Sequence, residues 1–152
     1  MTHKKPHVGI IMGSKSDLPI MEKASEFLTE YGIANDVYVA SAHRNPDKVK
    51  ALVADFEENS SVIIAAAGMA AHLPGVVAAY TTTTPVIGVP IRSSFDGLDA
   101  LMSIVQMPPG IPVATVAVNG AKNAAILAME MIAIHDDSVK ESLRKFRATF
   151  NA

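Results

Sequence analysis

The sequence of 152 residues contains no cysteine and no tryptophan, and only 18% of its residues are charged. Without cysteine the chain has no disulfide framework, no thiolate nucleophile and no cysteine-based metal site. Aromatic residues make up only 5%, and the net charge is −2 with no basic run, which argues against nucleic-acid binding. No apolar run reaches the roughly 18 residues that a membrane-spanning helix needs. We therefore expect neither nucleic acid nor a membrane as a partner.

Apolar residues are correspondingly abundant, at 49% of the chain. A chain of this length is expected to form one domain, residues 1–152, with a sizeable core. So small a domain cannot hide this much apolar material alone, so we expect large contacts between copies in a closed homo-oligomer. Residues 1–6 lead directly into a strand pattern rather than into the apolar core of a signal peptide, which predicts a cytoplasmic protein.

Five apolar segments alternate with helical patterns along the chain. This alternation predicts an α/β fold, a three-layer sandwich with a five-stranded parallel sheet. Asp96 is placed to cap the fourth helix, and we expect the amphipathic last helix to pack at a subunit interface. The expected strands cover residues 7–12, 36–40, 61–66, 85–89 and 113–118, and the expected helices cover residues 18–31, 46–58, 73–80, 98–105, 121–135 and 137–150.

A turn rich in hydroxyl groups, Gly13–Asp17, follows the first expected strand. Glycine permits a close backbone approach, the hydroxyls can donate, and a helix N-terminus favours an anion, so the turn suits a phosphate. The same residues also suit simple N-capping by Ser16 or Asp17. The two interpretations carry equal weight, and the glycine spacing of a Walker loop is absent.

The highest concentration of side chains suited to catalysis or binding follows the second expected strand, in Ser41–Pro46. The imidazole of His43 is suited to moving protons near neutral pH, and the guanidinium of Arg44 is a natural fork for a phosphate or carboxylate. The alternative is that Ser41 caps the next helix, His43 is a satisfied core residue and Arg44 is a surface cation. Three such coincidences at one strand end are less common than one site, so the pattern favours function.

The third polar segment is Gly68–Gly75, whose small residues let backbone amides approach a ligand but also suit tight helix packing. His72 is either a proton carrier or a local cap, and a structural role is favoured. Because the carboxyl ends of parallel strands meet at one edge of a sheet, we expect all three segments to converge there. A Ser-His-Asp hydrolase built from Ser14, His43 and Asp17 lacks the Gly-x-Ser-x-Gly elbow and is disfavoured.

The remaining histidines, His3, His7 and His135, look incidental. No pair of histidines has the spacing of metal ligands, and no carboxylate cluster accompanies one. The sequence therefore predicts no metal site.

Four motifs in register carry a family resemblance: Gly13–Asp17, Ser41–Asp47, Ala70–Gly75 and Ser103–Pro108. From about Val8 to Arg147 the chain resembles the bacterial-type N5-carboxyaminoimidazole ribonucleotide mutase family of purine biosynthesis. The resemblance implies a flavodoxin-like fold assembled as an octamer. It also implies a reaction that moves a carboxylate from the exocyclic nitrogen of a ribonucleotide to the neighbouring ring carbon, with no metal, ATP or organic cofactor.

The resemblance further implies roles for particular residues. His43 would be the general acid and base, and Asp17 would accept hydrogen bonds from the ribose hydroxyls. Residues 107–110 would form a loop near the site. The phosphate would be held by Ser14, Ser41 and Arg44 with help from Ser16, and the migrating carboxylate by the backbone of Gly68, Ala70, Ala71, His72 and Leu73.

The third motif contains one departure from the family. Where the family usually has a second glycine, this chain has Met69, which must point away from the ligand or avoid a positive φ. Animal and some bacterial members of the family carboxylate aminoimidazole ribonucleotide directly with carbon dioxide, and their third motif differs. Ala71–Pro74 favours the mutase over that carboxylase. A noncatalytic nucleotide-binding module on the same fold is a further alternative.

Overall fold

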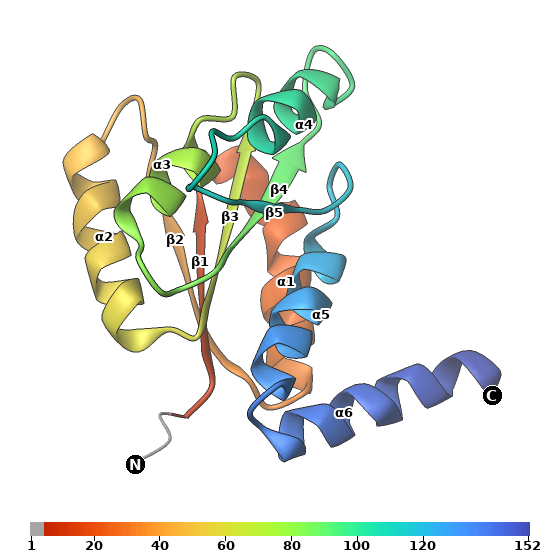
Figure 1. Cartoon of the computed structure of the whole chain (residues 1–152). Coiled ribbons are helices and arrows are strands. Elements are labelled where there is room, and N and C mark those ends of the chain that lie inside the picture. The colour runs from red at the N-terminus through yellow and green to blue at the C-terminus, as the bar shows by residue number, and fades with distance from the viewer. Residues whose placement is uncertain (1–4) are drawn as a thin grey trace.

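The computed structural model describes residues 5–152, and it forms a parallel sheet covered on both faces by helices (Figure 1). The strands lie in the order β2-β1-β3-β4-β5, which is the flavodoxin-like order, so the predicted fold class is confirmed. The strands are β1 (His7–Met12), β2 (Ala34–Val39), β3 (Val62–Gly68), β4 (Val86–Ile91) and β5 (Ala114–Thr115). The α-helices are α1 (Leu18–Glu30), α2 (Pro46–Asn59), α3 (Leu73–Tyr80), α4 (Leu98–Val105), α5 (Ala121–Ala133) and α6 (Asp137–Ala148), and 3₁₀ turns cover Lys15–Asp17 and Thr149–Asn151.

Two apolar layers hold the helices against the sheet. Helices α1 and α5 cover one face, and α2, α3 and α4 cover the other. Alternate residues of β1 serve the two layers, with Ile10 in the first and Ile11 in the second. At Gly9 an added Cβ would lie 2.6 Å from the ring of Phe56, so glycine is what lets α2 pack this close to β1. Within residues 5–152, no helix is long and apolar enough to cross a membrane.

The last strand is shorter than the sequence pattern predicts. β5 covers two residues rather than residues 113–118, although Val116 still donates to the Gly88 carbonyl (3.2 Å). Pro90 is the next residue of β4 on the side that faces β5, and it has no N–H to continue the ladder. The chain therefore leaves the sheet, and Asn119 closes the bend with a bond from its N–H to the Pro90 carbonyl (2.8 Å).

The expected cap of α4 is also wrong. The helix starts at Leu98 after Gly97, which has φ 85°, and no side chain caps it. The Asp96 carboxylate instead accepts two hydrogen bonds from the Arg92 guanidinium (2.6 and 3.0 Å). A charged donor four residues earlier competes better for this carboxylate than the backbone amides of the helix do.

The C-terminal helix packs on the body of its own chain. The Phe146 ring contacts Phe27 and Tyr31 of the α1 end, with ring centroids 5.0 and 5.9 Å apart. Phe150, at the end of the chain, remains exposed. That residues 137–150 lie at a subunit interface stays a prediction.

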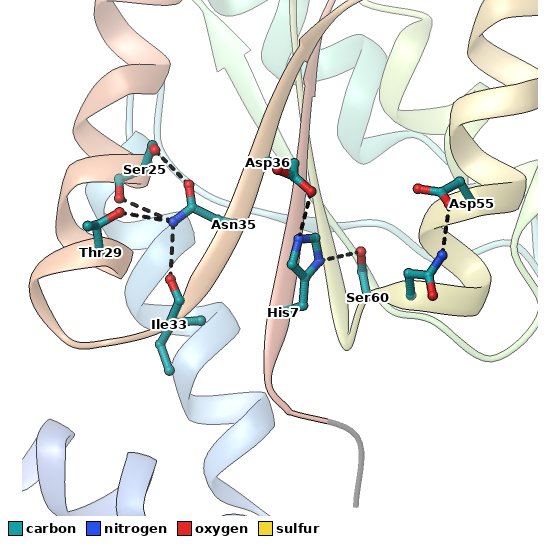
Figure 2. Close-up of polar contacts among 9 residues, drawn as sticks. His7, Ser25, Thr29, Ile33, Asn35, Asp36, Asp55 and Ser60 are labelled. Atoms are coloured by element: carbon teal, nitrogen blue, oxygen red, sulfur yellow. Dashed lines mark hydrogen bonds and ion pairs between the residues drawn. The ribbon is translucent and has the colours of Figure 1, made fainter.

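A hydrogen-bonded chain of three side chains ties the amino edge of the sheet together (Figure 2). His7 Nδ1 lies 2.9 Å from Ser60 Oγ, and His7 Nε2 lies 3.0 Å from Asp36 Oδ2. The imidazole thus links β1, β2 and the end of α2, so His7 is not incidental. Ser60 is buried, and its N–H donates to the Phe56 carbonyl (2.7 Å) at the end of α2. This Ser-His-Asp group therefore has a structural role, and Ser60 is not a nucleophile. His3 lies outside the described residues, and His135 is exposed.

Glu57 of α2 holds the loop that leads into β4. Its Oε1 accepts hydrogen bonds from the Thr82 N–H (3.0 Å), the Thr83 N–H (2.9 Å) and the Thr83 hydroxyl (3.0 Å). Burial raises the pKa of this carboxyl, but the hydrogen bonds from residues 82–84 outweigh burial and bring the pKa to about 2. The charged form is therefore the one that the folded state stabilises.

Replacing Glu57 by glutamine is expected to lower the free energy of unfolding by about 1–2 kcal/mol at pH 7. Because the pKa is lower in the folded chain than in the unfolded one, this stabilisation is present above about pH 4.5 and is lost as the pH falls to about 2. Denaturant unfolding at several pH values measures the effect. Glu58→Gln, an exposed neighbour on the same helix, is the control and should change little. A Glu57→Gln deficit that does not shrink in acid would contradict the assignment.

Candidate active site

Three polar loops meet at the carboxyl edge of β2, β1 and β3, which are neighbours in the sheet. Backbone bonds hold the strand ends side by side, since Ala40 donates to the Met12 carbonyl (2.9 Å) and Gly13 donates to the Ala66 carbonyl (3.2 Å). Side chains then join the loops: Arg44 Nη2 donates to the Gly13 carbonyl (3.1 Å). The segments that the sequence singled out thus lie at one edge, as parallel strands require.

In the first loop, Ser14 is the capping residue rather than Ser16 or Asp17. Its Oγ accepts a hydrogen bond from the Ser16 N–H (3.3 Å) and lies 2.9 Å from Ser16 Oγ, at the start of the 3₁₀ turn that precedes α1. Neither Ser16 nor Asp17 makes a capping bond to α1. At Gly13 an added Cβ would meet nothing within 4 Å, so this turn faces open space.

Asp17 is the buried acid of the site. It is only 7% exposed, and burial raises the pKa of its carboxyl, while a hydrogen bond from the Ser14 backbone partly offsets the rise. A carboxyl in this setting is stabilised by any further donor that reaches it. Hydroxyl groups of a bound ligand are donors of that kind.

In the second loop, Ser41 closes a turn rather than capping α2. Its Oγ accepts from the Arg44 N–H (3.2 Å) and its carbonyl accepts from the Asn45 N–H (2.8 Å). Helix α2 begins at Pro46 without a side-chain cap. This turn leaves both His43 and Arg44 exposed at the edge of the sheet, so His43 is not a core histidine.

The third loop contains two left-handed residues that are not glycine. Met69 has φ 55° and Ala71 has φ 42°. A bond from the Ala71 N–H to the Gly68 carbonyl (2.9 Å) closes the turn. Met69 therefore does not avoid a positive φ, at a cost of about 1–2 kcal/mol for a side chain in this region. Ala71 and Leu73 are buried, whereas Met69 and Ala70 are exposed.

His72 brings the third loop into contact with the second. It occupies the position before α3, but its side chain makes no capping bond. Instead, its Nδ1 is hydrogen-bonded to Nε2 of His43, and the two rings lie edge to face with centroids 4.6 Å apart. A hydrogen bond between two ring nitrogens needs one donor and one acceptor, so the pair holds a single proton between these atoms. The arrangement can pass a proton from one imidazole to the other.

This pairing was not predicted, because 29 residues separate the two histidines. The only signal in the sequence was that each follows a strand of the parallel sheet, so that both were expected at its carboxyl edge. The structure does not support the Ser-His-Asp hydrolase alternative, since the Ser14 hydroxyl is hydrogen-bonded to the Ser16 hydroxyl.

The loop after α4, expected near the site, packs along α3. An added Cβ at Gly75 would lie 3.2 Å from Met107 Sδ, so Met107 packs on the first turn of α3. Gly110 lies farther along, where it lines a cavity of about 230 Å³ with residues 81–86 beyond the last turn of α3. Within residues 5–152, no group of three His, Asp or Glu side chains is arranged to hold a metal ion.

Known proteins resemble this chain in both sequence and structure. The family model described as AIR carboxylase matches residues 7–152. A Pyrococcus abyssi protein named N5-carboxyaminoimidazole ribonucleotide mutase is 56% identical over 144 residues, which cover 93% of this chain and 82% of that protein. A Saccharomyces cerevisiae phosphoribosylaminoimidazole carboxylase is 50% identical, over 93% of this chain but only 25% of that longer protein. The crystal structure of Treponema denticola PurE superposes with a TM-score of 0.85 at 30% identity, covering 96% of this chain and 92% of that one.

Proposed function

Because this chain belongs to the AIR carboxylase family, we propose that it is a mutase of purine biosynthesis, an isomerase that interconverts N5-carboxyaminoimidazole ribonucleotide and 4-carboxy-5-aminoimidazole ribonucleotide. The observation that carries the proposal is the exposed His43, hydrogen-bonded to His72 and adjacent in sequence to Arg44, at the edge where three loops meet. A proton carrier beside an anion-binding guanidinium is what a carboxylate shift on a nucleotide requires.

The proposed reaction proceeds through free carbon dioxide inside the site. The bond between the exocyclic nitrogen and the carboxylate breaks, which releases carbon dioxide and leaves an electron-rich aminoimidazole. The ring carbon then attacks the trapped carbon dioxide, a carbon–carbon bond forms, and the ring carbon loses its proton. In net terms one proton moves from the ring carbon to the exocyclic nitrogen, and His43 is the group we assign to carry it. The remaining task is confinement, which places the reacting atoms together and excludes water.

The other residues of the site are proposed to hold the substrate. The exposed guanidinium of Arg44 and the clustered hydroxyls of the first loop suit a phosphate, and the buried Asp17 suits the ribose hydroxyls. The turn that starts at Gly68 offers backbone groups to the carboxylate. The full assignment is phosphate to Ser14, Ser16, Ser41 and Arg44, ribose to Asp17, and carboxylate to the backbone of Gly68, Ala70, Ala71, His72 and Leu73.

An isotope experiment tests this function against direct carboxylation, the activity named for the yeast relative. Unlabelled N5-carboxyaminoimidazole ribonucleotide is supplied in buffer containing ¹³C-bicarbonate. A mutase retains the carboxylate of its substrate, so the first product should carry almost no label. A carboxylase must draw its carbon from solution and would give labelled product instead. A noncatalytic module would form no product.

We also propose that the chain works as a homo-oligomer, with the octamer of the family as the expected form and the cytoplasm as the expected location. Support comes from a row of large apolar side chains exposed along α4. Phe95 is 72% exposed, Leu98 is 62% exposed, and Met102 and Val105 continue the row at helical spacing. Such a stripe is typical of a surface that a partner covers.

A further inference from the structure

The first turn of α3 packs against a side chain from the loop that follows α4. Gly75 is the third residue of α3, and a Cβ added there would lie 3.2 Å from Met107 Sδ and 3.4 Å from Met107 Cε. The end of the Met107 side chain therefore rests on the Gly75 backbone, at a distance that only glycine accommodates without crowding. Met107 is half-buried, so this contact belongs to the packing between the two segments.

A second contact places the same turn against the sheet. A Cβ added at Gly88 of β4 would lie 3.4 Å from Pro74 Cβ and 2.5 Å from Ile104 Cγ2, so α3 and α4 both approach β4 closely at this glycine. Pro74 adjoins Gly75 in the first turn of α3. That turn therefore contacts β4 through Pro74 and the segment after α4 through Gly75.

The position of this turn matters because His72 directly precedes it. The His72 carbonyl accepts a hydrogen bond from the Val76 N–H (3.0 Å), which ties the residue to the helix. From this place the His72 imidazole reaches His43. A hydrogen bond between two ring nitrogens depends steeply on distance and angle, so a small displacement of the first turn of α3 would change it.

We propose that Met107 is a positioning residue, which packs on Gly75 and thereby keeps the His72 imidazole within hydrogen-bonding reach of His43. This inference rests on the proposed mutase reaction, in which His43 carries the proton. It gives the loop after α4 a role that acts through α3 and needs no contact with the nucleotide. A misplacement of about 1 Å that originates away from the chemistry can cost about 100-fold in rate, so a packing contact of this kind is sufficient.

Removal of the contact is tested with Met107→Ala, and Met107→Leu is the matched control because it keeps a side chain of similar volume. The alanine variant should lower kcat about tenfold, since the first turn of α3 loses its support. The leucine variant should stay within about twofold of the wild type. Steady-state kinetics with N5-carboxyaminoimidazole ribonucleotide measures both, and an unchanged kcat in Met107→Ala would contradict the proposal.

The same contact can be changed from its other side. Alanine is a better helix former than glycine, so Gly75→Ala should not weaken α3 by itself. Its methyl group would crowd Met107 Sδ, however, and should displace the turn. Gly75→Ala should therefore lower kcat severalfold in the wild type and much less in Met107→Ala, where the space is free. Equal losses in both backgrounds would show that the two residues do not act together.

A double-mutant cycle separates positioning from a general loss of stability. The variant His72→Ala lacks the imidazole that Met107 is proposed to position. Adding Met107→Ala to His72→Ala should therefore lower kcat no further. If Met107→Ala lowers kcat equally with and without the imidazole of residue 72, Met107 does not act through His72 and the proposal is wrong.

Nuclear magnetic resonance tests the arrangement without turnover. In protein labelled with ¹⁵N-histidine, Met107→Ala should shift the ring-nitrogen resonances of His43 and His72, whereas those of His7, at the amino edge of the sheet, should not move. Unchanged resonances of His43 and His72 would overturn the role of Met107, whatever the activity. If these resonances shift but the wild type forms no product from N5-carboxyaminoimidazole ribonucleotide, the packing role stands and the mutase function is wrong.

Discussion

Replacing His43 by asparagine is expected to lower kcat about 1,000-fold while nucleotide binding stays close to that of the wild type. Asparagine is similar in size to histidine and can still donate a hydrogen bond, but its amide does not exchange a proton near neutral pH. The shift of the proton from ring carbon to nitrogen would lose its carrier. Steady-state kinetics with N5-carboxyaminoimidazole ribonucleotide gives kcat, and calorimetric titration with the product nucleotide gives the affinity.

A second histidine variant provides the control for this result. His135 is exposed beside a cavity of about 490 Å³ at the amino edge of the sheet, on the far side from the site, so His135→Asn should leave kcat unchanged. If His43→Asn turns over like the wild type, the catalytic assignment of His43 is wrong. Loss of both turnover and nucleotide affinity would instead place His43 in substrate binding.

Removing the Arg44 side chain is expected to raise KM by roughly 10- to 100-fold with a small effect on kcat, as the loss of one or two charge-assisted hydrogen bonds predicts. The guanidinium also donates to the Gly13 carbonyl (3.1 Å), so Arg44→Ala should loosen the contact between the first two loops. Arg44→Lys retains the charge but not the fork, and we expect an intermediate KM. Arg144→Ala, an exposed position on α6, is the control.

The proposal that Arg44 holds the phosphate of the substrate can be tested more directly than by KM. Product affinity can be compared between the nucleotide and the corresponding nucleoside, which lacks the phosphate. In the wild type the nucleotide should bind much more tightly, and Arg44→Ala should reduce that preference. An unaltered KM, or an unaltered preference for the nucleotide, would show that Arg44 does not hold the phosphate.

Convergence of the three loops could be predicted because it depends only on sheet order and strand polarity. Apolar runs mark the strands, and parallel strands bring their carboxyl ends to one edge. The contact between His43 and His72 could not be predicted, because it depends on the left-handed turn at Met69 and on the short turn closed by Ser41. Neither turn has a sequence signature that fixes where an imidazole points.

The mistaken predictions have similar causes. The strand pattern over residues 113–118 reflects the hydrophobicity of the side chains alone. The length of β5 is instead limited by a backbone feature, the missing N–H of Pro90 on the neighbouring strand. Asp96 is a good capping residue by type, but Arg92 takes its carboxylate. His7 seemed incidental because its partners, Asp36 and Ser60, lie far away in sequence and approach only when the strands pair. In each case a residue outside the local pattern decides the outcome.

The two edge strands of the sheet bear on whether this apolar chain can add further strands and form fibrils. Strand addition needs a long row of free backbone groups, and β5 offers only two residues in strand conformation. The opposite edge is β2, where Asp36 places a charge and the Lys48 ammonium already occupies the Val39 carbonyl (3.0 Å). Cross-β growth of this apolar chain is therefore disfavoured, and the oligomer that we propose would form through helix surfaces, where side-chain shape limits the number of copies.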